Sequence, residues 1–161
     1  MRIRPTTEDD AAAVTALWTE AYTGRGPGGR RTPYEQSEFF ASARLGQMFV
    51  AEEEAALVGV IVFYPPTAPG RTVAGEGEAE HSRLAVSGAA RGRGIGRALA
   101  ALCVELAREA GAEAIVLWSR PYQVEAHRLY ESLGYRRAHE RDSEDADGSR
   151  LVFVLDVLAD R

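Results

Sequence analysis

Hydrophobic residues recur along the chain with two periods, one typical of helices and one typical of strands. In four segments apolar side chains return every three or four residues, which places them on one face of a helix. The first predicted helix follows a capping residue, Thr7 or Asp9, and ends near residues 22–24. The other predicted helices cover residues 34–43, 94–110 and 124–133.

Short runs of β-branched and aromatic residues between turn residues predict the strands. Residues 48–51 and 57–63 flank a polar turn and form a predicted hairpin, and Ile3 marks a short edge strand. The other predicted strands are residues 80–86, residues 114–118, a strand from residue 135 to a turn near residues 145–149, and residues 151–157. This alternation, with hairpins at both ends, predicts an α/β fold with a mixed sheet in one domain, residues 1–161.

Two long segments rich in glycine and proline interrupt this pattern. Residues 24–32 predict a mobile loop. Residues 65–77 form a loop of unusual length, which is typical of functional or disordered segments. We expect both loops to be able to close over a substrate.

Charge and cysteine content narrow the classes of partner and the compartment. The chain of 161 residues has a formal net charge of −5, which argues against nucleic acid or an acidic membrane surface as the main partner and suits a cationic substrate. The single cysteine, Cys103, excludes an intrachain disulfide and is predicted to be a core residue. Because no apolar run is long enough for a membrane span or a signal peptide, the cytoplasm is the expected compartment.

The clearest chemical signal is a glycine-rich turn between a predicted strand and a predicted helix. A helix N-terminus presents unpaired N–H groups and a partial positive charge, and glycines let the backbone approach a ligand closely. Three arginines, Arg91, Arg93 and Arg97, add positive charge beside this predicted anion site. The turn reads Arg91-Gly92-Arg93-Gly94-Ile95-Gly96.

Two nucleotide-binding motifs fail at this turn. A P-loop requires Lys and then Ser or Thr after its last glycine, whereas Arg97 and Ala98 follow Gly96. A dinucleotide fingerprint that starts at Gly92 requires a glycine at position 97, where Arg97 stands. A tight strand-to-helix turn with exposed arginines and no ligand remains the alternative interpretation of the turn taken alone.

Two motifs resemble the GNAT superfamily of acetyl-CoA-dependent N-acetyltransferases. Arg91, Gly94 and Gly96, after the strand end Leu84-Ala85-Val86, are similar to the family's pyrophosphate motif: Gln or Arg, two residues, Gly, one residue, Gly or Ala. Residues 126–135, Ala-His-Arg-Leu-Tyr-Glu-Ser-Leu-Gly-Tyr, are similar to the family's final helix and strand entry. The motifs stand in the expected order and separation, and the resemblance covers about residues 78–157.

The resemblance implies a mixed, mostly antiparallel central sheet of about seven strands, flanked by helices and splayed between the fourth and fifth strands. Acetyl-CoA would enter this splay as the cosubstrate, between the strands of Glu80 and Ala114. The strand end Leu84-Ala85-Val86 would bind the pantetheine arm, and the backbone amides of residues 91–97 would hold the pyrophosphate. Gln123 stands where the family often has an asparagine that contacts the cofactor, and His127 is expected at the cofactor edge.

Acyl transfer from a thioester to an amine requires an acid for the departing thiolate, and Tyr130 is the candidate. The resemblance places a tyrosine here close to the sulfur, and a phenol pKa near ~10 keeps it protonated at neutral pH. A purely structural role on the apolar face, beside Leu129 and Leu133, is the alternative.

The amine requires a base, and Glu80 is the candidate, acting through water. Glu78 and His81 are rivals, and a solvated edge carboxylate is the alternative. The backbone N–H of Val86 is the oxyanion donor that the resemblance implies. Strict alternation along the strand would place four side chains on one face unless a bulge interrupts it: Glu80, Ser82, Leu84 and Val86.

The sequence therefore predicts an N-acetyltransferase that acts by direct attack in a ternary complex. The acceptor would be a small-molecule amine or a protein amine, and a homodimer is compatible with the resemblance. A CoA-binding sensor without turnover is the alternative, and Tyr130 favours the enzyme. No metal site is predicted, because His81, His127 and His139 lack companion ligands. The aromatic candidates for the acceptor pocket are Trp18, Tyr22, Phe63, Tyr64 and Trp118.

Overall fold

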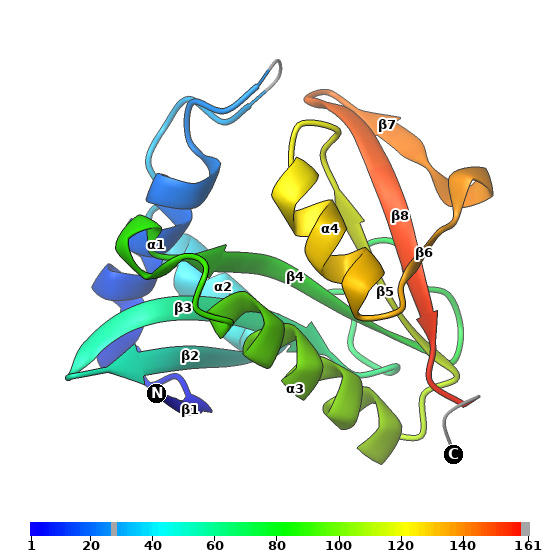
Figure 1. The fold of residues 1–161 in the computed structure, drawn as a ribbon, viewed down its shortest axis with the longest axis horizontal. Coiled ribbons are helices and arrows are strands. Elements are labelled where there is room, and N and C mark those ends of the chain that lie inside the picture. Colours follow the sequence, from blue (N-terminus) through cyan, green and yellow to red (C-terminus); the bar gives the residue numbers. More distant parts are fainter. Residues whose placement is uncertain (27–28, 159–161) are drawn as a thin grey trace.

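The computed structural model describes residues 1–26 and 29–158 and forms an open, twisted sheet with helices on both faces (Figure 1). α1 and α2 pack on one face, and α3 and α4 pack on the other. The helices are α1 (Ala11–Tyr22), α2 (Gln36–Leu45), α3 (Ile95–Glu109) and α4 (Val124–Ser132). Residues 27–28 of the predicted loop over residues 24–32 lie outside the described residues.

The strands agree with the predicted sheet. They are β1 (Arg2–Pro5), β2 (Gln47–Glu53), β3 (Ala56–Tyr64), β4 (Glu78–Val86), β5 (Ala114–Ser119), β6 (Arg136–Arg137), β7 (Ser143–Asp145) and β8 (Gly148–Asp156). Their order is β1-β2-β3-β4-β5-β8-β6, and β7 pairs with β8. Within the described part of the chain, the named pairs are antiparallel except β4–β5, so the predicted mixed, mostly antiparallel sheet is confirmed.

The β4–β5 pair is short, and the two strands then separate. Their register covers only three positions, from Glu78 opposite Ala114 to Glu80 opposite Val116. Beyond them β4 continues to Val86 and β5 to Ser119, and Figure 1 shows the two ribbons diverging. The predicted splay between the fourth and fifth strands is therefore confirmed.

A bulge in β4 changes which side chains share a face. Val60 of β3 lies opposite Ala85 and Val62 lies opposite Ser82, so three steps along β4 match two along β3. Arg83 absorbs the extra residue with a left-handed backbone, at a φ of 54°.

The predicted common face of Glu80, Ser82, Leu84 and Val86 is wrong because of this bulge. Leu84 and Val86 pack in the core beneath α3 and α4. Glu80 instead binds residues 72–74, whose apolar members belong to the cluster on the opposite face of the sheet.

Two further details differ from the pattern-based prediction. The first helix is preceded by a 3-10 turn, Glu8–Asp10, which is fixed because Asp10 accepts the Thr7 N–H at 2.7 Å. The strand expected from residue 135 is interrupted by another 3-10 turn, His139–Arg141, between β6 and β7. Here the Asp142 carboxylate accepts the Val152 N–H at 2.8 Å, so a side chain takes the place of the backbone carbonyl that a neighbouring strand would supply.

α3 approaches the sheet closely at Gly59 of β3. A Cβ atom at this position would lie 2.9 Å from Ile95 Cγ2 and 2.9 Å from Leu99 Cδ1. Both neighbours are fully buried, so neither can move away freely. The absence of a side chain at Gly59 therefore fixes the depth at which the first turn of α3 rests on the sheet.

Gly59→Ala should consequently destabilise the protein by about 1–3 kcal/mol, because an added methyl overpacks a buried contact. Urea unfolding of both proteins measures the difference. Gly75→Ala is the matched control, since its Cβ would meet only Glu78 Oε1, at 3.5 Å, and its effect should stay within about 0.5 kcal/mol. Equal stability of the two variants would contradict the close-packing argument.

Candidate active site

The glycine-rich turn forms an uncapped helix start. Gly94 is the N-cap of α3 and has a left-handed backbone with φ 80°, and Gly92 has φ 76°. No side chain hydrogen-bonds to the cap position, so the first N–H groups of α3 keep their donors free and point out of the helix end. This arrangement suits an anion, because the helix dipole adds partial positive charge there.

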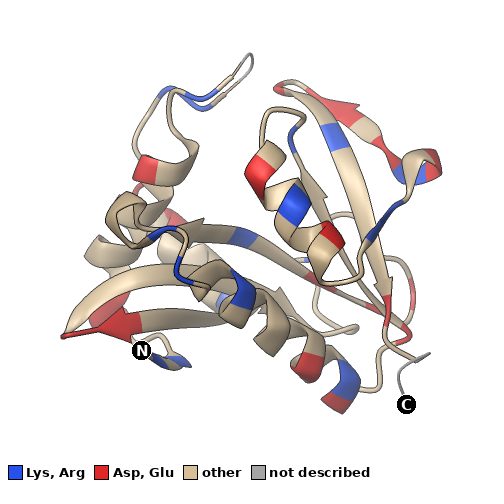
Figure 2. Ribbon diagram, viewed as in Figure 1, with Lys and Arg blue, Asp and Glu red and all other residues tan. Residues whose placement is uncertain are grey.

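Arginines surround this turn, as the blue segments before and at the start of α3 show (Figure 2). Arg93 forms an ion pair with Glu53 of β2, and Arg97 donates to the Ser132 hydroxyl of α4. Arg91 is exposed. Positive charge therefore borders the turn on three sides, and two of the three guanidinium groups are held by neighbouring elements.

The end of β4 and the start of α3 meet α4 at one point. A Cβ on Gly96 would lie 3.5 Å from Val86 Cγ2 and 3.4 Å from Leu129 Cδ2. Leu84, Val86 and the buried Ile95 belong to the same apolar cluster. Ala85 points to the other face, into the cluster beneath α1. The structure thus brings Leu84, Val86, Ile95 and Gly96 together, as the sequence predicted for a shared site.

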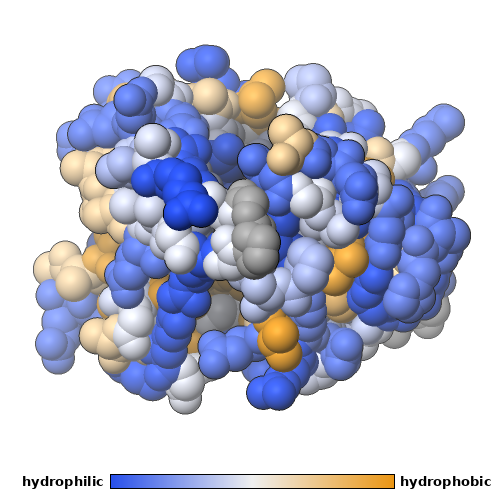
Figure 3. Space-filling view, turned by 90° about the horizontal axis from the view of Figure 1, so that it is seen from above, coloured by the Kyte–Doolittle hydropathy of each residue, from blue (hydrophilic) through white to orange (hydrophobic). Residues whose placement is uncertain are grey.

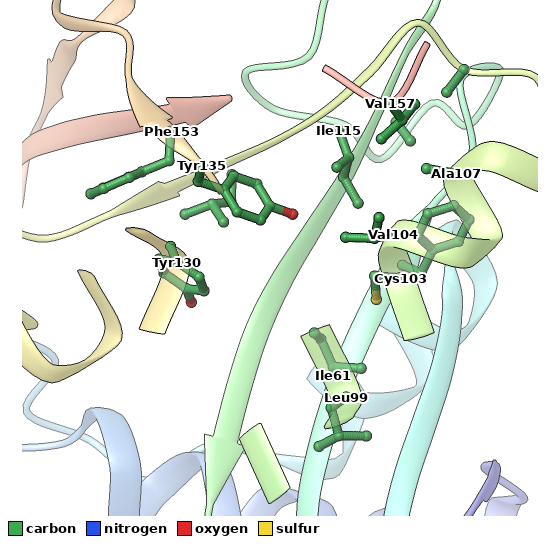
Figure 4. Close-up of a cluster of buried hydrophobic side chains, with 14 of the residues drawn as sticks. Ile61, Leu99, Cys103, Val104, Ala107, Ile115, Tyr130, Tyr135, Phe153 and Val157 are labelled. Atoms are coloured by element: carbon green, nitrogen blue, oxygen red, sulfur yellow. The ribbon is translucent and has the colours of Figure 1, made fainter. Parts of the chain in front are cut away.

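Tyr130 lies on α4 in an aromatic cluster next to the unpaired part of β4 (Figure 4). Its ring centre is 5.7 Å from His81, 5.8 Å from Tyr135 and 5.7 Å from Phe153. Its hydroxyl makes no hydrogen bond to the described residues, and burial raises the pKa of Tyr130 above its usual value. The phenol is therefore protonated at neutral pH, with a proton free to donate.

His81 shares the face of Tyr130 and is neutral. It is 2% exposed, and burial lowers the pKa of His81 to about 4. Its Nε2 atom has no hydrogen-bond partner among the residues described. Because it titrates so low, His81 is a weak proton acceptor in the folded protein.

Glu80 is buried on the opposite face of β4 and holds the loop over residues 65–77. Its Oε1 accepts the N–H groups of Thr72 at 3.0 Å, Val73 at 2.8 Å and Ala74 at 2.8 Å. Its Oε2 accepts only the Thr72 N–H, at 3.0 Å. Burial raises the pKa of Glu80 above the ordinary carboxyl value, and the three amides act in the opposite direction.

Gln123 and His127 lie on the β5 side of the divergence. Gln123 Oε1 accepts the Arg120 N–H at 2.7 Å and the Ser119 hydroxyl at 2.9 Å, so this amide oxygen shapes the turn from β5 into α4. His127 Nε2 lies 3.1 Å from the Ser119 hydroxyl. Ser119 is buried and was not singled out by the sequence, because nothing local marks a serine at a strand end as part of a polar cluster.

α1 contacts the bulge of β4 with two aromatic side chains. Trp18 Nε1 donates to the Arg83 carbonyl at 3.1 Å, and the Tyr22 hydroxyl donates to the Leu84 carbonyl. The sequence named both aromatics as candidates for the acceptor pocket, and their spacing of four residues on one helix could have indicated that they contact the same strand. It did not indicate Arg83, the bulge residue of β4 whose carbonyl Trp18 binds.

The segment after α1 also reaches the far side of the divergence. A Cβ on Gly26 would lie 2.4 Å from Tyr122 Cδ1, so the glycine packs directly on that ring. Tyr122 belongs to the turn between β5 and α4. Residues from both halves of the sheet therefore meet across the splay.

The described residues contain neither a candidate metal site nor a candidate membrane-spanning helix. No cluster of three or more His, Cys, Asp or Glu side chains suited to a metal ion occurs in residues 1–26 and 29–158. Among the helices in those ranges, none combines the length and apolarity that crossing a membrane requires.

Comparison with known protein families identifies the family of this chain. The model of the acetyltransferase (GNAT) family matches residues 11–135. Among curated proteins, N-acetylaspartate synthetase of Danio rerio is 35% identical over 82 residues, which are 47% of this chain and 29% of the relative. N-acetyltransferase family 8 member 2 of Rattus norvegicus is 32% identical over 92 residues, 57% of this chain and 39% of the relative. This chain therefore spans less than half the length of these curated relatives.

Solved structures share the fold over nearly the whole chain. Ribosomal-protein-alanine N-acetyltransferase from Brucella melitensis superposes with a TM-score of 0.76 at 22% identity, covering 97% of this chain and 99% of that one. The structure of yncA from Salmonella typhimurium, solved with its cofactor acetyl-CoA, has a TM-score of 0.76 at 22% identity and covers 98% and 94%.

The neutral state of His81 predicts a specific pH dependence of stability. An exposed histidine in the unfolded chain titrates near ~6.5, so between that pH and about 4 the unfolded state binds one more proton than the folded state. Stability should therefore fall as the pH falls through this window. His81→Phe keeps a ring beside Tyr130 and removes the titration.

We expect wild type to lose up to about 3 kcal/mol more unfolding free energy than His81→Phe between pH 6.5 and pH 4. Urea unfolding of both proteins at several pH values measures this difference, and all other titrating groups cancel in the comparison. Parallel losses in the two proteins would mean that His81 is protonated in the folded state.

Proposed function

The chain belongs to the acetyltransferase (GNAT) family, and on that premise we propose that it transfers an acetyl group from acetyl-CoA to a primary amine. The amine attacks the thioester directly in a ternary complex. The observation that carries the proposal is the edge of β4, which leaves its pairing with β5 at Glu80 and leads into the uncapped start of α3.

The proposed acetyl-CoA site follows this edge. The free amides at the start of α3 suit the pyrophosphate, because Gly92 and Gly94 present them without a side chain in the way and Arg91 adds charge. The stretch of β4 beyond Glu80 has no β5 partner, so its backbone can bind the amides of the pantetheine arm as an added strand. Gln123 and His127 would then contact the cofactor from the β5 side.

Tyr130 is proposed as the acid that protonates the departing thiolate. Its free hydroxyl, its raised pKa and its place beside the unpaired part of β4 support this role. The N–H group of Val86 is proposed as the donor to the oxyanion of the tetrahedral intermediate.

Glu80 is proposed as the base that accepts the amine proton through water. Its Oε1 is occupied by three amides, whereas Oε2 shares only the Thr72 amide and keeps a lone pair available. The raised pKa makes this carboxylate a stronger base than a surface glutamate. The same side chain therefore anchors residues 72–74 and faces the amine.

The acceptor is proposed to be a small-molecule amine or a protein amine. The names of the similar proteins refer to both kinds of acceptor: one to acetylated aspartate and another to an alanine of a ribosomal protein.

Gly94→Glu should abolish acetyl-CoA binding, with a loss of more than about 100-fold in affinity. The variant places a carboxylate where the pyrophosphate is proposed to lie, and like charges repel there. Calorimetric titration with acetyl-CoA measures the dissociation constant.

Gly111→Glu is the matched control, at the other end of the same helix. Both glycines have a positive φ and no atom within 4 Å of an added Cβ, so the two variants carry a similar backbone cost. Gly111→Glu should bind acetyl-CoA like wild type. An unchanged dissociation constant in Gly94→Glu would remove the cofactor site from this turn.

Tyr130→Phe should lower kcat by about 100-fold and leave the affinity for acetyl-CoA within about threefold, since general acid catalysis typically supplies ~10²–10⁴-fold. Free-thiol release with an amine acceptor measures kcat. Tyr135→Phe is the control, because Tyr135 is a neighbouring buried tyrosine whose hydroxyl has no described partner. Equal kcat in wild type and Tyr130→Phe would exclude the acid role.

A further inference from the structure

Arg83 has an environment that the proposed chemistry does not use. Of the partly buried arginines in residues 1–26 and 29–158, it is the one whose guanidinium forms no hydrogen bond or ion pair. Its Nη1 atom is enclosed and unpartnered. An enclosed guanidinium nitrogen without an acceptor is costly, so the side chain is poised for a negatively charged partner.

The backbone of Arg83 adds to this cost. Its φ of 54° lies in the left-handed region, which non-glycine residues adopt rarely and at a cost of about 1 kcal/mol or more. Glycine or asparagine would satisfy the bulge more easily. An arginine at this position therefore indicates a use for its side chain, since the backbone alone disfavours it.

Aromatic rings hold the guanidinium in place. Its central carbon lies 5.1 Å from the ring centre of Trp18 and 5.5 Å from that of Tyr34. The neighbouring carboxylate, Glu38, is already bound by Arg30 through two hydrogen bonds of 2.7 Å. Arg83 is thus oriented by stacking and leaves its donors for an external ligand.

Arg83 lies on β4 between Glu80 and Val86, on the face of α1 and Glu80. It is therefore on the amine side of the proposed reaction, opposite the face that carries Tyr130. Across the divergence, Arg120 and Arg150 both bind Asp145. The surface seen from above is mainly hydrophilic, with small separate hydrophobic areas (Figure 3).

We propose that Arg83 binds the carboxylate of the acceptor, so that the acceptor is an amino acid with both a primary amine and a carboxylate. This inference rests on the proposed acetyl transfer. It differs from the expectation of a cationic substrate from the net charge of −5, because Arg83 is a local cation to which no carboxylate is bound. Arg83 is then a specificity-determining residue, because the planar fork of donors in its guanidinium matches a carboxylate.

The test compares amino acids with their amides. Wild type, Arg83→Gln and Arg83→Lys are assayed by free-thiol release with the twenty L-amino acids, their carboxamides, and amines without a carboxylate such as phenethylamine and spermidine. Arg44→Gln, at an exposed arginine of α2, is the matched control. Thermal unfolding verifies that each variant is folded.

Wild type should prefer an amino acid over its amide by at least about 10-fold in kcat/KM. Arg83→Gln should lower kcat/KM for the acid by about 10- to 100-fold, mainly through KM, and abolish the preference, which corresponds to the loss of one charge-assisted hydrogen-bonded contact. Arg83→Lys should recover part of the preference for the acid, because lysine keeps the positive charge but lacks the planar fork of donors. Arg44→Gln should behave like wild type.

Two outcomes overturn the inference while leaving acetyl transfer in place. One is equal activity on acids and amides, or acetylation of carboxylate-free amines alone. The other is an unchanged acid preference in folded Arg83→Gln. Calorimetry with acetyl-CoA distinguishes failure of this inference from failure of the proposed function. If wild type binds acetyl-CoA but acetylates no amino acid, the carboxylate site is refuted. If wild type does not bind acetyl-CoA, the proposed function and this inference are refuted together.

Discussion

The early end of the β4–β5 pairing is the constraint on which the rest of the structure depends. A parallel pair in the middle of a sheet would normally continue, since unpaired backbone groups inside a protein are costly. Here the pairing stops after Glu80 and Val116, and other groups take over part of the exposed edge. Trp18 and Tyr22 of α1 supply donors to the carbonyls of Arg83 and Leu84. The position of α1 therefore helps to keep β4 apart from β5. These two candidate pocket aromatics thus have a structural role as hydrogen-bond donors to the strand.

The loop over residues 65–77 is likewise held in place by a residue to which we assign a chemical role. Its amides converge on Glu80, while Arg141 binds Glu78 at 2.7 Å and the Val73 carbonyl at 2.8 Å. The loop is thus attached to the last paired residues of β4 and to the 3-10 turn before β7. A loop of this length without such attachments would cost considerable entropy to order. The carboxylate that we propose as the base is in this way also the residue that orders one border of the site.

The sequence was informative wherever the signal was local. Apolar periodicity located the helices, and the glycines at 92 and 94 predicted a turn with positive φ before an uncapped helix start, because these are properties of the segment itself. Features that depend on distant partners were not predictable. The bulge at Arg83 arises from its register with β3, so alternation gave the wrong face for Leu84 and Val86. The rings around Arg83 come from segments that are remote in sequence, and the amides around Glu80 come from a loop whose path no local pattern indicates.

The bulge explains how one strand can serve two sides of a group transfer. Before it, His81 faces Tyr130 and Tyr135, whereas Glu80 faces the loop on the other side. After it, Leu84 and Val86 pack toward α3 and α4, so the strand end fits the glycine-rich turn, while Arg83 remains on the face of α1. Direct attack requires the amine to approach from one side of the thioester while the thiolate leaves toward an acid on another. A regular strand would have placed Leu84 and Val86 on the face of Glu80, away from α3. In the reaction that we propose, the extra residue at Arg83 would therefore separate the acceptor side from the side of the leaving group.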